Sequence, residues 1–252
     1  MFPIASLAFI SGMIAGSFVG VVAHRVPQGR SIVGPRSECP SCGTTIAAYD
    51  NVPVISWLLL GGRCRSCHER IPARYPLIEL AVGAAFAATA IVLYEDPAQL
   101  ALGLVLVAML AAVTLTDLER GIIPNAVLLV GAVIGVGIVA ATDPASLPER
   151  GIAAAAAGGF LLAALLIHPR GMGMGDVKLA AVMGLFLGGS VGPALLVALA
   201  AGAAVGIAIM LTQGAEARKR AIPFGPFLAL GGVVGLLAGP ELLDLYLDTF
   251  AG

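Results

Sequence analysis

Two aspartates at the ends of apolar segments are the residues of this sequence whose type and position could do chemistry. Asp176 follows glycines in Gly173-Met174-Gly175-Asp176, and Asp117 ends another apolar stretch. Burying an ionisable carboxyl group inside a bilayer is unfavourable in free energy, and a carboxyl group at the bilayer boundary also suggests a role. The placement of these two residues therefore indicates a function. When two carboxyl groups share a proton, the protonated one can polarise a peptide carbonyl while the ionised one activates water. We therefore predict that Asp117 and Asp176 are the catalytic pair of an intramembrane aspartyl protease.

The glycines beside Asp176 predict how a substrate would be held. Gly173 and Gly175 have no side chains to block a peptide backbone and can adopt positive φ, so an extended substrate could lie beside the aspartate. We assign Gly173, Gly175 and Lys178 to substrate binding.

Helix ends predict which aspartate holds the proton. Asp176 would open a helix, where the positive end of the dipole favours the anion, whereas Asp117 would close one. This difference favours the proton on Asp117. The structural alternative is that Asp176 only caps its helix, while Asp117 faces lipid headgroups with Arg120.

All four cysteines form two C-x-x-C pairs, Cys39-Pro-Ser-Cys42 and Cys64-Arg-Ser-Cys67. Each pair can place two thiolates on one metal ion, and two pairs complete a tetrahedral Cys₄ zinc site. Disulfides are the alternative, but thiols stay reduced in the cytoplasm, where we place this segment. Cys64 to His68 also matches the C-x-x-C-H form of haem attachment, which the second pair and the compartment disfavour.

The composition indicates the scaffold that must position these residues. The chain has 252 residues, of which 59% are apolar and 12% charged, and its mean hydropathy is +0.98. Soluble domains are about 45–50% apolar, so we expect an all-α polytopic membrane protein. A membrane helix needs roughly 20 apolar residues, which gives about eight transmembrane helices. The expected spans are 2–23, 76–94, 97–116, 123–142, 151–168, 177–189, 191–212 and 224–246.

The longest stretch between the spans predicts a separate domain. Residues 24–75 are rich in Arg, Pro, Ser and Cys, and about fifty residues need a staple such as a metal to fold. We expect three regions: a first transmembrane helix at 1–23, a cytoplasmic Cys₄ zinc domain at 24–75, and a transmembrane protease core at 76–252.

Basic residues predict the orientation in the membrane. With the amino terminus outside, thirteen of the fourteen lysines and arginines fall on the cytoplasmic side, and only Arg150 falls outside. This is a strong form of the positive-inside bias. Both aspartates then lie at the cytoplasmic face, as a catalytic pair requires.

Taken together, the motifs resemble the prepilin peptidases, also called type IV leader peptidases, over nearly the entire chain. The matching stretches are Gly16-Ser17-Phe18 with His24-Arg25-Val26-Pro27, Asn51-Val52-Pro53 with Ser56-Trp57-Leu58, Gly62–Cys67, Arg74–Glu79, Gly173-Met174-Gly175-Asp176-Val177-Lys178, and Ile222–Phe227. One departure is Asn125, where many relatives have Asp; it lies outside the proposed pair.

The resemblance implies a substrate and a second activity. Family members cut type IV prepilins or type II secretion pseudopilins on the carboxyl side of a glycine, at the border between a basic leader and an apolar helix. Members with the cysteine loop are often bifunctional and N-methylate the new amino terminus with S-adenosylmethionine. We expect the bacterial inner membrane as the location, membrane lipids as further partners, and no nucleic acid.

Two other classes of protein remain open from the sequence. A proton-coupled transporter with a zinc-stabilised cytoplasmic domain would also contain intramembrane carboxyl groups, although it would place them near the midplane rather than at helix ends. A structural scaffold of a membrane assembly needs no acidic pair.

Overall fold

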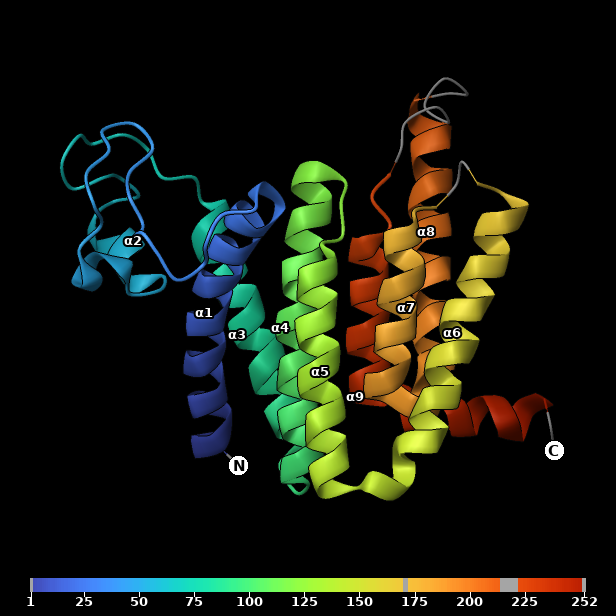
Figure 1. The fold of residues 1–252 in the computed structure, drawn as a ribbon. Coiled ribbons are helices and arrows are strands. Elements are labelled where there is room, and N and C mark those ends of the chain that lie inside the picture. Colours follow the sequence, from blue (N-terminus) through green and yellow to red (C-terminus); the bar gives the residue numbers. More distant parts are fainter. Residues whose placement is uncertain (1, 170–171, 214–221, 251–252) are drawn as a thin grey trace. The chain divides into compact units, whose positions relative to one another are not determined.

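The computed structural model describes residues 2–169, 172–213 and 222–250, which form helices joined by turns and two isolated bridges (Figure 1). The chain divides into two compact units, Met1–Tyr94 and Glu95–Gly252. The helix over residues 74–93 belongs with the first helix in the first unit. The three-region division at residues 23 and 75 stays a prediction.

The first unit contains two long helices and the cysteine-containing segment between them. Helix α1 (Phe2–Arg25) packs on α3 (Arg74–Leu93), and glycines allow the close approach. A Cβ at Gly12 would lie 2.7 Å from Cβ of Phe86. The intervening segment includes the short helices η1 (Val26–Gln28), η2 (Ala48–Asn51) and α2 (Ile55–Leu59).

The second unit is a bundle of six α-helices among the described residues. They are α4 (Pro97–Arg120), α5 (Asn125–Thr142), α6 (Leu147–Ile167), α7 (Met174–Leu187), α8 (Val191–Gln213) and α9 (Gly225–Phe250), with 3₁₀ turns η3 (Pro144–Ser146) and η4 (Gly188–Ser190). Large side chains from four of these helices fill one buried core, including Leu106, Leu161, Met183 and Leu228. Helix α7 packs mainly on α6, and α8 on α9.

The number of membrane helices follows from a chain reversal after α7. Seven described stretches are long and apolar enough to cross a membrane, and one of them, Met174–Thr212, contains both α7 and α8. Gly188, with φ 55°, turns the chain between them, and the two helices run in opposite directions in Figure 1. The prediction of about eight transmembrane helices in an all-α protein is therefore confirmed.

Helices α7 and α9 depart from a simple full-length span. With 14 residues, α7 is about 21 Å long, shorter than a hydrocarbon core of about 30 Å. Helix α9 has a non-helical residue at Ala238, followed by Pro240, and the chain changes direction there (Figure 1). Proline removes a helical hydrogen bond and clashes with the preceding turn, which accounts for the kink.

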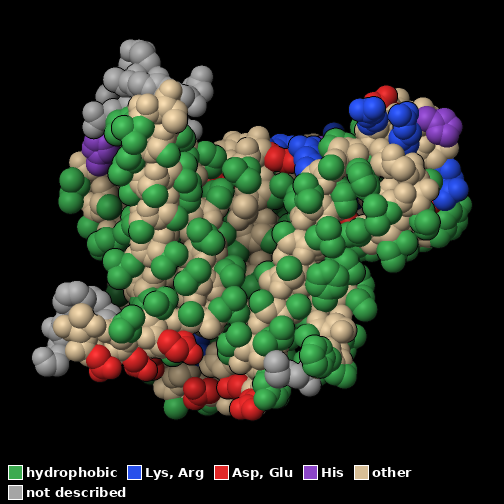
Figure 2. Space-filling view, turned by 180° about the vertical axis from the view of Figure 1, so that it is seen from behind, with side chains coloured by type: hydrophobic (Ala, Val, Ile, Leu, Met, Phe, Trp, Pro, Cys, Tyr) green, Lys and Arg blue, Asp and Glu red, His purple; other side chains and the backbone are tan. Residues whose placement is uncertain are grey.

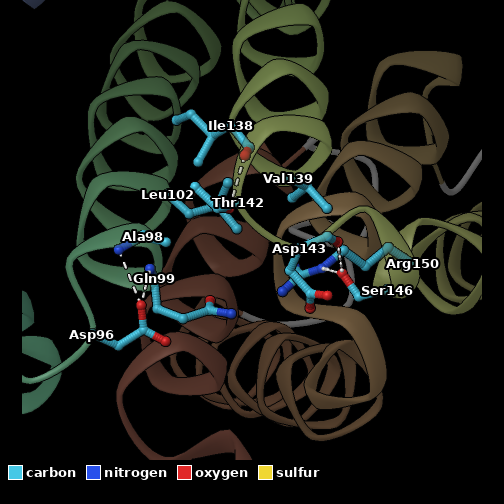
Figure 3. Close-up of a pocket in the computed structure, with 10 residues that line it drawn as sticks. All are labelled: Asp96, Ala98, Gln99, Leu102, Ile138, Val139, Thr142, Asp143, Ser146 and Arg150. Carbon is cyan, nitrogen blue, oxygen red and sulfur yellow. Dashed lines mark hydrogen bonds between the residues drawn. The ribbon is translucent and has the colours of Figure 1, made fainter.

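Arg150, the one basic residue expected on the outer side, closes the carboxyl end of α7. Its Nη1 donates to the carbonyl oxygens of Leu185 and Phe186 at 3.2 and 2.6 Å. Its Nε donates to Ser146 Oγ at 3.2 Å (Figure 3). A cation at this helix end is stabilised by the dipole. Arg150 also lines a cavity of about 160 Å³ between the ends of α4, α5 and α6. Acidic side chains gather along the lower edge of the molecule in Figure 2.

Candidate active site and metal centre

Asp117 lies in the last turn of α4, and its side chain reaches the beginning of α9. Its carboxylate is 7% exposed, and Oδ2 accepts a hydrogen bond from the backbone N–H of Gly225 at 2.8 Å. A Cβ at position 225 would lie 2.7 Å from that oxygen, so only glycine allows this approach without displacement. The carbonyl of Asp117 accepts from Gly121, whose φ of 64° ends α4.

Asp176 lies in the first turn of α7 and reaches back to the residue before the helix. Its Oδ2 accepts from the backbone N–H of Gly173 at 2.9 Å, which is the acidic half of a capping box. Its side chain is also 7% exposed. The packing of Val177, Leu179 and Ala180 in the core fixes the helix that carries it.

The two carboxyl groups lie at the same end of the second unit, because Gly175, next to Asp176, packs against Ile123 in the connection that follows Asp117 and α4. Within the part of the chain that the structure describes, each Oδ2 accepts a hydrogen bond from a glycine N–H, and neither Oδ1 is sealed from solvent without a partner. This leaves one oxygen of each carboxyl group available to water or to a substrate carbonyl.

The structure bears on both alternatives raised for the aspartates. Asp176 does cap its helix, but Asp117 is buried against Gly225 rather than facing headgroups. Asp117 also lies at the N-terminus of α9. At Asp117 the positive end of the α9 dipole offsets the negative end of the α4 dipole. The prediction that the proton lies on Asp117 considered only the end of α4 and was therefore incomplete.

The residues assigned to substrate binding lie near Asp176 and have protein contacts of their own. Gly173 is exposed with φ −94°, and Gly175 is not among the positive-φ glycines, so neither uses a left-handed backbone. A Cβ at Gly175 would lie 2.9 Å from Cβ of Ile123, so this glycine lets α7 pack on the α4–α5 connection. Lys178 is exposed and donates from Nζ to Asn125 Oδ1 at 3.0 Å. Their role in substrate binding stays a prediction.

Gly225 and Ile123 were given no role from the sequence, although both contact this site. Gly225 lies in the Ile222–Phe227 stretch that carries the resemblance, so the motif marked its position without showing what it contacts. The sequence signal that could have marked Gly225 is its position between two Pro-Phe pairs. Its partner, 108 residues away in the sequence, could only come from the fold.

The four cysteines come together in the first unit through two similar turns. Gly43 N–H donates to the carbonyl of Cys39, and His68 N–H donates to that of Cys64. Gly43 and His68 both have positive φ, at 69° and 59°. An isolated antiparallel bridge closes each turn. His68 therefore completes a turn, and the group that could hold a metal consists of the four cysteines.

The thiol groups have the spacing of metal ligands, and the pKa is lowered for two of them, whereas burial and the neighbouring thiols raise the pKa of Cys67 to about 12. All four sulfur atoms lie within 4.8 Å of one another, and Cys39 Sγ lies 3.8 Å from Cys67 Sγ. The Thr44 hydroxyl, 3.4 Å from Cys42 Sγ, and its backbone N–H lower the pKa of Cys42 to about 6. Backbone N–H groups of Cys67 and Ser66 lower the pKa of Cys64. The cluster can therefore hold a metal ion.

Comparison with known families matches both units of the chain. Residues 10–93 match the bacterial peptidase A24 N-terminal domain, and residues 104–211 match the type IV leader peptidase family. No solved structure matches.

Curated relatives cover most of the chain. It is 36% identical to the prepilin leader peptidase/N-methyltransferase of Burkholderia pseudomallei, over 93% of this chain and 85% of that protein. Identity to the Aeromonas hydrophila protein of the same name is 35%, over 97% and 94%. The Bacillus subtilis one is 34% identical, over 98% and 99%.

Proposed function

Because this chain belongs to the type IV leader peptidase family, we propose that it is a membrane endopeptidase that removes the amino-terminal leader of prepilins. It is also an N-methyltransferase of the new amino terminus, as the names of its relatives state for them. The observation that carries the peptidase is the pair of buried carboxyl groups, Asp117 and Asp176, each oriented by a glycine N–H. The proton-coupled transporter is not favoured.

In this proposal Asp117 and Asp176 share one proton. The ionised carboxylate accepts a proton from water as the water oxygen bonds to the scissile carbonyl carbon, and the protonated carboxyl group donates to the carbonyl oxygen. The C–N bond then breaks, and the amine leaves with the proton taken from water. The Oδ1 atoms are the ones that act, since each Oδ2 is engaged by the N–H of Gly225 or Gly173.

We propose that the cysteine cluster holds structural zinc. A tetrahedral Zn²⁺ with Zn–S bonds of about 2.3 Å separates its sulfur ligands by roughly 3.8 Å, and Cys39 and Cys67 already have this separation. Four thiolates are the donors that zinc takes in structural sites. Its binding would supply the folding free energy that this short segment lacks.

We propose S-adenosylmethionine as the methyl donor on the names of the relatives. No group of described residues marks a site for it, and no step is assigned to particular side chains. Cleavage after a glycine, pseudopilins as further substrates, and Gly173, Gly175 and Lys178 as substrate contacts belong to the same proposal.

We propose an inner-membrane location with the amino terminus outside and the active site on the cytoplasmic side. The distribution of basic residues supports it, although Arg170 and Arg218, Lys219 and Arg220 lie outside the described residues. Arg150, the exception to the positive-inside pattern, is engaged by the carboxyl end of α7.

The decisive experiment incubates the purified full chain, reconstituted in bilayers, with a prepilin and follows the loss of its leader. Asp117→Asn and Asp176→Asn should each abolish cleavage, whereas Asp143→Asn, an exposed aspartate at the other end of the second unit, should not. Cleavage that survives both substitutions would remove the proposed mechanism. Proton flux without cleavage by the intact protein would establish the transporter instead.

A further inference from the structure

Helix α2, in the segment between α1 and α3, presents three large apolar side chains on one side. Ile55, Leu58 and Leu59 are 53%, 64% and 82% exposed, while Ser56 is buried. Such a cluster would be unfavourable in water, and contiguous exposed apolar groups commonly mark an interaction surface. We call these three side chains the α2 face.

A hydrogen bond fixes the depth of α2 beside the membrane helix α3. The backbone N–H of Val54, the residue before α2, donates to Glu79 Oε2 at 2.7 Å. Glu79 is the sixth residue of α3, so it lies about 8 Å along the axis from the first residue. The 20 residues of α3 are about 30 Å long, the thickness of a hydrocarbon core. Helix α2 therefore begins alongside the membrane-spanning part of α3, rather than beyond its end.

Several contacts hold α2 in a fixed orientation. Val54 has φ 62°, a strained conformation for a β-branched residue, which the bond to Glu79 helps to maintain. Ser56 Oγ donates to the carbonyl of Tyr49 at 2.9 Å, and Trp57 Nε1 donates to that of Ile71 at 3.0 Å. The α2 face is thus a rigid surface.

The segment that contains α2 is rich in arginine. Residues 24–75 contain seven arginines and three acidic residues, a net charge of +4 before any metal is bound. Arg63 lies four residues after the end of α2, with its N–H donating to the carbonyl of Leu60, and forms a bridge with Arg70. Both arginines are exposed, and basic side chains gather at the upper right of Figure 2. Apolar groups beside exposed arginines fit the boundary between acyl chains and anionic phospholipid headgroups.

We propose that α2 anchors the cysteine-containing segment to the membrane surface. Ile55, Leu58 and Leu59 insert among the acyl chains, and Arg63 and Arg70 contact the phosphates of anionic phospholipids. The segment is then half-embedded at the bilayer boundary instead of free in the aqueous phase, and its metal centre is held at a fixed height above the lipid.

Trp57 makes the proposal directly testable, because it is the only tryptophan of the chain and lies within α2. We would reconstitute the full chain in phosphatidylglycerol bilayers with or without bromine atoms near the headgroup end of the acyl chains. Bromine quenches tryptophan only at short range, so emission should fall roughly twofold with the brominated lipid at this interfacial depth. The same comparison, with and without bromine, in bilayers made only of phosphatidylcholine should give weaker quenching. Equal emission with and without bromine would overturn the proposal.

Variants locate the contact on the α2 face. The double variant Leu58→Gln with Leu59→Gln should lose most of the quenching, while Val33→Gln, 94% exposed but outside α2, should keep it. Bound metal serves as the check that the segment is folded. If Val33→Gln lowers the quenching as much as the double variant, the face is wrongly assigned. If bromine does not quench Trp57 and the variant Leu59→Cys cross-links to residues 95–252, the α2 face is covered by the second unit and the lipid proposal fails.

Discussion

The cysteine site and the aspartate site are built in opposite ways. The four cysteines lie within 29 residues of one another, and each pair is closed by its own local turn. The two carboxyl groups come from helices 59 residues apart, and Asp117 is oriented by a glycine 108 residues further along. One site needs a single short segment, whereas the other needs the packed ends of α4, α7 and α9.

Because the two sites are built differently, we expect a substitution at one site to leave the other intact. A local site that is closed by a metal depends on its ligands and on the protons that compete for them. A site assembled from helix ends depends on how closely those ends approach. Substitutions that leave the chemistry of the carboxyl groups intact, but change the packing around them, should therefore impair only the second site.

The largest expected effect separates the two sites in one experiment. Asp176→Asn removes an ionisable group of the pair and should lower leader cleavage at least about 10³-fold. Metal content and methylation of an already cleaved pilin should be unchanged, because the cysteine segment forms its turns without α7. Metal analysis and mass spectrometry of both reactions measure this. A loss of metal in this variant would show that the sites are not independent.

The reciprocal change is Cys39→Ser, which removes the buried thiol of the proposed Cys₄ site. The wild-type chain should hold about one zinc ion, and the variant close to none, with the segment 24–75 becoming sensitive to protease. Leader cleavage should fall far less than metal content does. Full zinc retention by Cys39→Ser, or an unchanged metal content after treatment with a chelator that strips zinc, would contradict a Cys₄ site.

Gly225→Ala tests the tertiary contact at the aspartate site. The added Cβ would lie 2.7 Å from Asp117 Oδ2, so the carboxyl group must move. A displacement of about 1 Å can cost roughly 100-fold in rate, and we expect a loss of this size in cleavage at unchanged metal content. The matched control is Gly137→Ala in α5, where a Cβ meets nothing within 4 Å. Equal rates for the two variants would exclude a positioning role for Gly225.

Gly175 offers a smaller effect that distinguishes packing from substrate binding. Gly175→Ala places a methyl group against Ile123 and should lower cleavage about tenfold by displacing the start of α7. If packing is the cause, Ile123→Gly, which removes the Cβ that the new methyl group would contact, should restore activity in the double variant. A defect that persists with a raised KM would instead support the proposed contact between Gly175 and substrate.

The smallest expected effect concerns protons at the cysteine site. Thr44→Val removes the hydroxyl that lowers the pKa of Cys42 to about 6, so that pKa should rise toward the ordinary value of 9.0. Zinc binds the thiolate, so a lower thiol pKa favours metal binding wherever the thiol with the higher pKa would be protonated, and the advantage disappears once the pH exceeds both pKa values. The zinc affinity of the variant should therefore be lower at pH values below its raised thiol pKa, by about tenfold below pH 6 if the thiol pKa rises by one, and should match the wild type above pH 9. Zinc titration at several pH values measures this, and a pH-independent difference would exclude the mechanism.

The sequence predicted the parts of the fold that depend on hydrophobicity and local spacing. Membrane helices follow from apolar runs, because a bilayer requires every backbone group to be paired within the span. The resemblance to type IV leader peptidases was confirmed, and so was the four-cysteine cluster as a possible metal site. The shortest predicted span, 177–189, did form the separate helix α7.

The sequence by itself determined the helices, the cysteine pairs and the two aspartates as candidates. Only the tertiary structure brought Asp117 beside Gly225 and engaged Arg150 with the end of α7. The physical reason is range: hydropathy, turns and C-x-x-C spacing act over a few residues. Contacts between helix ends, by contrast, depend on which helices pack together and how closely their small residues allow them to approach.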